Sequence, residues 1–473
     1  MEFLNSIWEI IFNNVVSRPA IFIGLIVVVG YIFLKKKWYE VIGGFIKAAV
    51  GYMILQVGAR NLLQSVDPLI KAVGQKWGVN AVVIDPNFGF SAASAALESI
   101  GHSLSMAMVS LLVAFVWNIL LVLFRRQTKV RTLFTTGHIM VKQAAVATWI
   151  IYFMVPSLRS IWGIVLTGIL CGTYWAVGSN MTVEATNDLT DNAGFAVGHQ
   201  QMFGIWLADK FSGKIGNKDK GVDKFELKGP FKLLDDYTVS TTVIMGLFFG
   251  VIILIIGEPI LREMDGAFAK DISFILYIFE KAASFAVNLT ILKTGVRMCV
   301  NELVVSFDGI SSSVLKGSVP AVDCAATYGF GAQNAITLGF IFGAIGQVIA
   351  IALLVITKNP ILIVPGFVPL FYDNATIGLY ANNKGGFRAL IVFCMASGIL
   401  QVLGSALAIS LFAMAPFGGY VGNLDWATIW PVIGYAINYL AVGGIVLAIV
   451  IMLIIPQLQY RKNKENYFEL QEN

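Results

Sequence analysis

Charged side chains are scarce in this sequence. Asp, Glu, Lys and Arg make up only 13% of the 473 residues, and hydrophobic residues make up 57%, whereas soluble domains usually carry about 25% charged residues. Water is therefore not the main solvent of the folded chain. A helix that crosses a bilayer core of about 30 Å needs roughly 20 apolar residues, so the chain has room for about ten crossings. The net charge of +5 indicates little about nucleic acid.

Cysteine is also rare, and the common signatures of enzymes are missing. The four cysteines lie in or beside apolar stretches and form no CxxC pair, which argues against a disulfide framework or a zinc site. The sequence contains no GxxxxGK(S/T), no HExxH, no GxSxG with a plausible triad and no paired aspartates suited to magnesium pyrophosphate. We therefore predict no catalytic residue, no metal ligand and no cofactor within this chain.

The apolar runs that are present predict an all-α polytopic membrane protein with eleven transmembrane helices and additional re-entrant hairpins. The predicted crossings cover about 20–34, 41–63, 103–124, 133–155, 160–178, 238–257, 272–292, 336–356, 360–380, 389–412 and 431–455. Basic clusters follow several of these runs, for example at Lys35, at Arg125 and at Arg461. Because such clusters favour the cytoplasmic side, we predict an outside N-terminus and a cytoplasmic C-terminus.

Few long hydrophilic stretches interrupt this pattern, and they set the predicted boundaries. The whole chain, 1–473, reads as a single transmembrane unit. Its predicted parts are an interfacial amphipathic helix at 1–18, a first half at 19–208, a lysine-rich cytoplasmic loop at 209–236, a second half at 237–455 and a cytoplasmic tail at 456–473.

Three stretches are too apolar for solvent and too rich in glycine or polar residues to face lipid: 80–100, 185–205 and 303–334. Non-helical backbone at membrane depth persists only where protein covers it or where it lines a wet cavity. We therefore predict that these stretches re-enter the membrane.

A weak internal echo accompanies these stretches. Gly58 precedes Asp85 at nearly the spacing at which Gly295 precedes Asp323, and a second echo pairs the Asp-Asn-Ala sequences at 191–193 and 373–375. In the predicted topology the two copies run in opposite directions across the membrane. Inverted repeats of this kind are common in transporters.

Histidine is rarer still, with three in the chain, and two of them stand in polar motifs bounded by apolar sequence: His138 and His199. Buried imidazole and carboxamide groups are costly without partners, so they either bond a neighbouring helix or hold a hydroxyl-rich solute. Asp323 is an acid within the membrane region, and such acids are functional by default. It could bind a solute hydroxyl, carry a proton, pair with Arg297 or cap a half-helix. Lys142 would attract an anionic solute or, alternatively, extend to the interface.

Six phrases resemble one known family. They are TTGHIM (135–140), GFAVGHQQ (194–201), GVRMCVNEL (295–303), AVDCAATY (321–328), IVPGFVP (363–369) and NATIGLYAN (374–382). Their content, order and approximate spacing are similar to those of the ascorbate-specific EIIC permease of the bacterial phosphotransferase system, the UlaA/SgaT family. One departure is that Lys142 and Gln143 stand where we expect the family to have two glutamines.

The resemblance implies a homodimer in the bacterial inner membrane, with a scaffold domain and a substrate-carrying core domain that moves like an elevator. It implies uptake of L-ascorbate coupled to its phosphorylation to L-ascorbate 6-phosphate, as the transporter component of a phosphotransferase. The phosphoryl donor would be a cysteine of the partner EIIB, itself charged by EIIA. The residues implied to bind ascorbate are His138, His199, Gln200 and Asp323, with Gln56, Gln143 and Gln201 behind them.

Two other functions remain open at this point. The first is an ion-coupled secondary transporter of ascorbate or a similar sugar acid, which would need no EIIA or EIIB and would depend on the membrane potential or pH gradient. The second is a membrane-embedded enzyme acting alone, which should turn over substrate in detergent without any partner.

Overall fold

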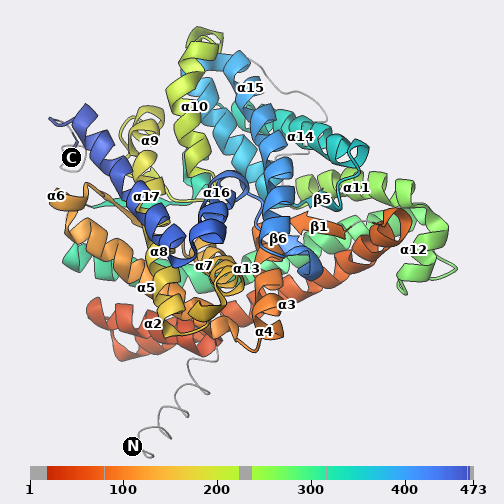
Figure 1. Cartoon of the computed structure of the whole chain (residues 1–473), viewed down its shortest axis with the longest axis horizontal. Coiled ribbons are helices and arrows are strands. Elements are labelled where there is room, and N and C mark those ends of the chain that lie inside the picture. The colour runs from red at the N-terminus through yellow and green to blue at the C-terminus, as the bar shows by residue number, and fades with distance from the viewer. Residues whose placement is uncertain (1–18, 79, 223–236, 316–317, 466, 469–473) are drawn as a thin grey trace, which may run out of the picture.

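The computed structural model describes residues 19–78, 80–222, 237–315, 318–465 and 467–468 (Figure 1). The interfacial helix predicted at 1–18 and the part of the predicted loop at 223–236 lie outside these described residues.

Helices make up most of the fold. Their bounds are α2 (Pro19–Phe33), α3 (Trp38–Trp77), α4 (Pro86–Ser99), α5 (Leu104–Leu123), α6 (Arg125–Thr128), α7 (Gly137–Met154), α8 (Ile161–Met181), α9 (Val183–Thr190), α10 (Met202–Ile215), α11 (Tyr237–Ile256), α12 (Glu258–Met264), α13 (Phe274–Val314), α14 (Gln333–Ile356), α15 (Asn374–Leu411), α16 (Leu424–Leu440) and α17 (Val442–Lys462). This helical content confirms the predicted class.

Six stretches of the described chain are helical, long and apolar enough to span a bilayer. They are Trp38–Gly58, Leu104–Leu123, Ile161–Met181, Asn334–Ile356, Val368–Leu411 and Val442–Lys462. Several large apolar side chains on these helices stay exposed, among them Val348 and Ile356 on α14 and Ile451 on α17. Such a surface suits lipid rather than water. The chain is therefore a multi-pass membrane protein.

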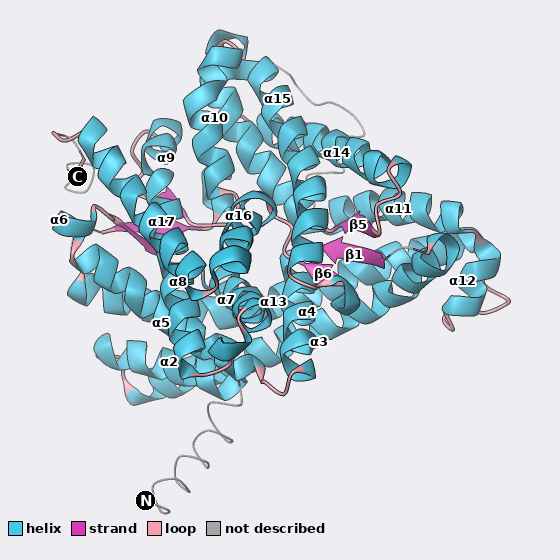
Figure 2. Ribbon diagram, viewed as in Figure 1, coloured by secondary structure: helices cyan, strands magenta, loops and turns pink. Residues whose placement is uncertain are grey.

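Two small parallel sheets, set apart from each other, interrupt the helices (Figure 2). One has the strand order β5-β1-β6 and the other β2-β4-β3. The strand bounds are β1 (Asn80–Ile84), β2 (Thr132–Phe134), β3 (Ala196–Val197), β4 (Val319–Val322), β5 (Ile361–Pro365) and β6 (Gly419–Tyr420). An all-α class did not include them, because strands of two to five residues are too short to give a period-2 pattern.

The two sheets exchange strands between the halves of the chain. The first strand of each half lies at the centre of a sheet, between the second and third strands of the other half. Ala81 of β1 pairs with Leu362 of β5, and Leu133 of β2 pairs with Pro320 of β4. This reciprocal order is the one expected of a duplicated chain.

Each central strand runs into an aspartate that caps the next helix. Asp85 follows β1 and accepts a hydrogen bond from the backbone N–H of Asn87 at 2.9 Å, at the start of α4. Asp323 follows β4 and accepts one from the N–H of Ala325, also at 2.9 Å, at the start of the 3-10 helix η6 (Cys324–Gly329). The first sequence echo thus pairs residues with the same local role.

The second echo is wrong. Asp191 is exposed at the C-terminal end of α9, before β3. Asp373 is buried at the end of a π-helical turn, η7 (Val368–Asp373), after β5. Three identical letters were too short a match to fix an equivalence between the halves.

Several predicted boundaries also change. The last predicted crossing, 431–455, contains a break at Ala441 (φ 47°) between α16 and α17, and these two helices pack against each other. The run at 360–380 begins as β5 and continues through η7 into α15, which bends at Gly386 (φ 62°). The predicted crossing at 133–155 starts at the end of β2, and α7 begins only at Gly137. Hydropathy registers apolar length and not these changes of backbone conformation.

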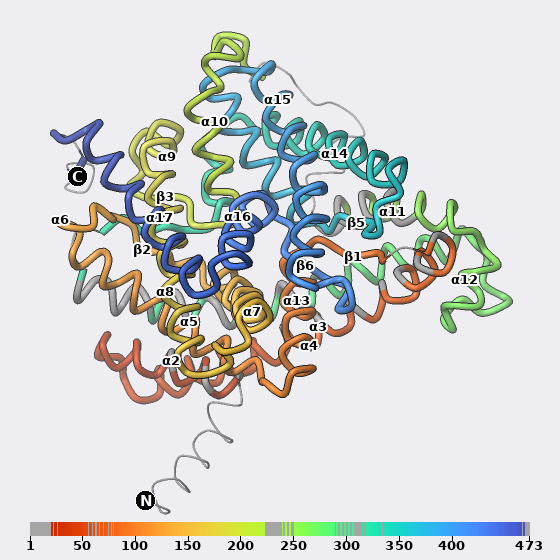
Figure 3. Tube along the Cα trace, in the orientation of Figure 1, coloured from red at the N-terminus to blue at the C-terminus, as the bar shows by residue number. Residues whose placement is uncertain are grey.

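The first strand of each half follows a very long helix. α3 has 40 residues and α13 has 41, which corresponds to about 60 Å of helix. They lie side by side, with α2 against both (Figure 3). Of the stretch predicted at 303–334 to re-enter the membrane, the part up to Val314 belongs to α13.

Candidate functional site

Three parallel strands bring the site together. His138 lies just after β2, His199 follows β3 and Asp323 follows β4, and these strands form one sheet in the order β2-β4-β3. Because the strands are parallel, their carboxyl ends meet at one edge, which is where open parallel sheets bind ligands. Residues nearly 200 positions apart in sequence therefore converge at that edge.

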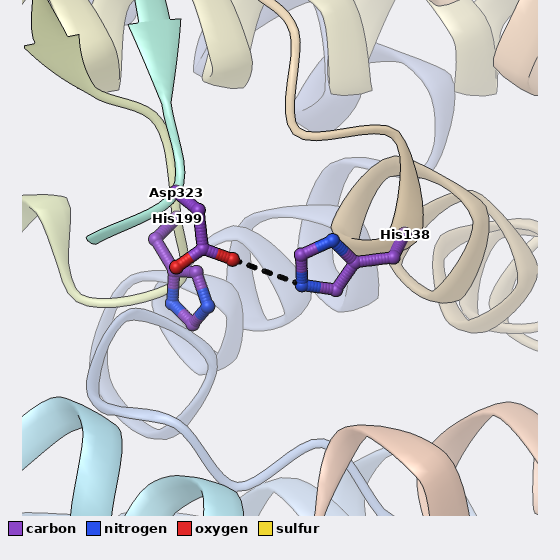
Figure 4. Close-up of side chains that lie close together, drawn as sticks. All are labelled: His138, His199 and Asp323. Carbon is purple, nitrogen blue, oxygen red and sulfur yellow. Dashed lines mark ion pairs between the residues drawn. The ribbon is translucent and has the colours of Figure 1, made fainter. Parts of the chain in front are cut away.

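The three side chains form a compact cluster (Figure 4). Nε2 of His138 lies 3.2 Å from Oδ2 of Asp323. The two imidazole rings meet edge to face with centroids 6.4 Å apart, and one ligand atom from each of the three residues lies within 4.8 Å of the other two. His199 is buried, while the side chains of His138 and Asp323 are 21% and 37% exposed. A solute can therefore reach the cluster.

Gln201 fixes the orientation and the tautomer of His199. Its Oε1 lies 2.6 Å from Nδ1 of His199 and also accepts the backbone N–H of Gln200 at 3.0 Å. Since Oε1 can only accept, the neutral imidazole carries its proton on Nδ1. Nε2 of His199 then remains an acceptor that can take a hydrogen bond from a solute hydroxyl.

In the residues that adjoin this cluster in sequence, several buried polar atoms have no hydrogen-bond partner within the described part of the chain. Both Nε2 and Oε1 of Gln200 are buried without a hydrogen bond, and so are Nε2 of Gln143 and Oγ1 of Thr136. Oε1 of Gln143 accepts a hydrogen bond from the indole of Trp175 on α8. Buried polar groups in proteins are nearly always paired, so the amide of Gln200, the residue after His199, can form hydrogen bonds with a polar solute at the cluster.

Lys142 is buried one turn after His138 on α7, with 6% of its surface exposed. Extension to the interface is therefore wrong for this side chain. Among the described residues its ammonium forms no ion pair, and the carboxylates whose charges act on it are Asp85 and Asp323. Two imidazoles and a carboxylate are also ligands that transition metals accept. A nearby ammonium opposes a dication there.

In the other sheet, the aspartate at the corresponding position, Asp85, is bonded by groups of the protein. The carboxylate of Asp85 is buried and accepts hydrogen bonds from the side-chain amide of Asn87 at 2.8 Å and from the N–H of Val368 at 3.0 Å. Gly366 lies directly against Asp85, and a side chain there would collide with it. This second edge therefore has no unpaired carboxylate oxygen to offer.

The structure thus brings together His138, His199 and Asp323, with Gln200, Gln201, Lys142 and Gln143 in the adjoining turns. Gln56 lies half-buried on α3, and no described hydrogen bond joins it to the cluster. Asp323 does cap a half-helix, as one alternative predicted, and its second partner is His138. Pairing with Arg297 concerns a side chain outside the described ones. Sequence reasoning missed Thr136, although it stands two residues before His138 in the same polar motif.

Comparison with known proteins adds the family. Residues 14–430 match the family model EIIC-GAT, described as the PTS system sugar-specific permease component. The chain is 31% identical over 438 residues to a protein of Mycoplasma pneumoniae (strain ATCC 29342 / M129 / Subtype 1) named "Ascorbate-specific PTS system EIIC component". That alignment covers 85% of this chain and 66% of the relative, so the chain spans just under two thirds of the relative's length. With a family match over most of its length, the chain belongs to the sugar-specific permease components of the phosphotransferase system.

Proposed function

We propose that the chain takes up L-ascorbate across the bacterial inner membrane while the phosphotransferase system phosphorylates it to L-ascorbate 6-phosphate. The observation that carries this proposal is the His138–His199–Asp323 cluster next to the buried amide of Gln200, which has no hydrogen bond to any described residue. Such a set suits a small solute with several hydroxyls. The relative from Mycoplasma pneumoniae, named as ascorbate-specific, supports the choice of solute.

Each site residue has a chemical task in this proposal. The carboxylate of Asp323 and Nε2 of His199 accept hydrogen bonds from solute hydroxyls, while the amide of Gln200 both donates and accepts hydrogen bonds. Asp323 carries a negative charge, as ascorbate does at neutral pH. It therefore contacts a hydroxyl remote from the charged enolate, because two anions at close range repel.

The phosphoryl group comes from outside the chain. The described cysteines, Cys171, Cys324 and Cys394, are buried, and the sequence contains no phosphate-binding glycine loop. A phosphocysteine of EIIB, charged by EIIA, supplies the group. The solute hydroxyl attacks phosphorus, the S–P bond breaks, and the thiol and a phosphate monoester remain. This chain binds, orients and releases the solute.

The remaining architecture belongs to the same proposal. The two halves, 19–208 and 237–455, form inverted repeats, with the N-terminus outside and the loop at 209–236 and the tail at 456–473 in the cytoplasm. A scaffold domain holds a homodimer together, and a core domain carries the solute by an elevator motion. The strand exchange between the halves supports the duplication.

Uptake of radiolabelled L-ascorbate tests the proposal in cells that lack their own ascorbate permease. Cells that express this chain with EIIA and EIIB are compared with cells that express it alone, and the internal product is identified. We expect L-ascorbate 6-phosphate only when both partners are present. Free ascorbate accumulating without them would indicate ion coupling instead, with Asp323 as the first candidate proton site. Phosphorylated product from the purified chain alone would indicate an autonomous enzyme.

A further inference from the structure

Lys142 is a buried cation, and among the described residues no carboxylate forms an ion pair with it. We propose that it makes the site selective for an anionic solute over a neutral solute of the same shape. This inference deepens the proposed function and rests on it, because it concerns how the same site distinguishes between solutes.

The position of Lys142 links it to the cluster. Lys142 lies four residues after His138 on α7, and residues four apart share one face of a helix. His138 projects from this face toward Asp323 (Figure 4). The side chain of Lys142 therefore extends from the same face of α7 as the imidazole that contacts Asp323.

Burial without a partner points to a ligand. With 6% of Lys142 exposed, its ammonium is largely removed from water, which is costly unless a counter-charge or hydrogen bonds replace the lost hydration. No described carboxylate lies within 4 Å of it. The acidic groups whose charges act on it are Asp85 and Asp323.

Both of these carboxylates already have other partners. Asp85 accepts hydrogen bonds from Asn87 and Val368. Asp323 accepts one from Ala325 and contacts His138. Neither acid is bound to Lys142, and within the described part of the chain its ammonium makes no hydrogen bond, so it can donate to an acceptor on a solute.

The charges around the cluster then determine whether an anionic or a neutral solute binds more tightly. An anion that enters beside the cluster meets the negative charges of Asp323 and Asp85, and the ammonium of Lys142 is the formal positive charge that offsets them. An enolate or carboxylate oxygen of the solute can also accept hydrogen bonds from the ammonium of Lys142. A neutral solute of the same shape gains neither effect. We therefore assign anion selectivity to Lys142 and recognition of hydroxyls to His199, Gln200 and Asp323.

Equilibrium binding to the purified, detergent-solubilised full-length protein tests this assignment. The two probes are L-ascorbate, an anion at neutral pH, and L-gulono-1,4-lactone, a neutral compound of closely similar shape. Their dissociation constants are measured by calorimetry for the parent, for Lys142→Gln and for Lys142→Arg. The control Lys36→Gln removes a positive charge from the exposed turn between α2 and α3.

We expect Lys142→Gln to weaken L-ascorbate binding by about tenfold or more, the effect of losing one charge-assisted contact. The same change should alter lactone binding by less than about threefold. Lys142→Arg and Lys36→Gln should keep the preference of the parent for the anion.

Two results would overturn the inference while leaving the proposed function standing. One is unchanged ascorbate binding by Lys142→Gln, and the other is an equal loss of both ligands, which would indicate a role in shape alone. If Lys142→Gln failed to fold, the unmutated chain would still decide, since equal affinity of the parent for both probes refutes anion selectivity. A folded parent that bound no L-ascorbate at all would instead refute the proposed function itself.

Discussion

Asp323 is held by the chain on both sides of its carboxylate. One oxygen accepts the N–H of Ala325 at the start of η6, and the other faces Nε2 of His138. The residue therefore combines a structural role, capping, with a chemical one, presenting a negative charge to the cluster. A substitution can separate the two roles because asparagine caps helices about as well as aspartate.

Asp323→Asn should preserve the fold and weaken binding of L-ascorbate. We expect the dissociation constant to rise by about tenfold to a hundredfold, the usual effect of losing a hydrogen bond to a charged group. Calorimetry gives the constant and thermal unfolding in detergent tests the fold. Asp191→Asn, at an exposed position at the end of α9, is the control. Parent-like binding by Asp323→Asn would exclude the proposed contact.

Substitution of Gln200 should keep or raise stability while it removes ligand binding. The side-chain amide of Gln200 is buried without a hydrogen bond to the residues that the structure describes, so it destabilises the protein without ligand, and an apolar side chain of similar size removes that cost. Gln200→Leu should therefore unfold at the same temperature as the parent or higher, and should lose the rise in unfolding temperature that L-ascorbate produces. A lower unfolding temperature without ligand would contradict this reading, because it would mean that the amide has a structural partner.

At the scale of elements, Gly198 controls how β3 leads into the site. A Cβ atom at this position would lie 2.9 Å from the carbonyl oxygen of Ala321 on β4 and 3.0 Å from the ring of Phe134 on β2. Both neighbours belong to the sheet whose edge carries the cluster. The absence of a side chain therefore lets the three strands approach closely enough for His199 to reach Asp323.

Gly198→Ala should displace His199 and weaken L-ascorbate binding by about tenfold or more, since hydrogen bonds weaken when distance and angle leave the favourable range. Gly213→Ala on α10 is a matched control, because a Cβ there meets nothing closer than 3.7 Å. If Gly198→Ala bound L-ascorbate like the control, the strand approach would not position the site.

The sequence predicted the residues of the cluster better than it predicted the strands that carry them. His138, His199 and Asp323 were identified because polar groups within apolar sequence are costly and rare. The strands that join them were missed because β3 has two residues and β2 has three. The sequence did not show that Asp85 and Asp323 have different surroundings, since both follow similar patterns. The difference comes from partners distant in sequence, Val368 for one and His138 for the other.

At the scale of the whole molecule, neither half can complete a sheet alone. β1 needs β5 and β6, while β4 needs β2 and β3. The exchange of strands also places residues of the first half, His138 and His199, against Asp323 of the second. The site is therefore a property of the assembled halves.

A protease site introduced within 223–236 tests this dependence. After cleavage, the two fragments should remain together in size-exclusion chromatography in detergent and should still bind L-ascorbate, because the strand pairs and the long contact of α3 with α13 lie elsewhere. Either fragment expressed alone should fail to give a stable, monodisperse product. A well-folded isolated half would show that the strand exchange is not required for folding.

The filled edge around Asp85 also has a consequence for stoichiometry. Two similar sheets could offer two equivalent binding sites. At Asp85, however, Asn87 and Val368 make the hydrogen bonds that a ligand would need. At Asp85 the carboxylate is bonded within the protein, whereas Asp323 lies in the partly exposed cluster with His138. A calorimetric titration with L-ascorbate should accordingly give one binding site per chain, although both sheets follow the same reciprocal strand order.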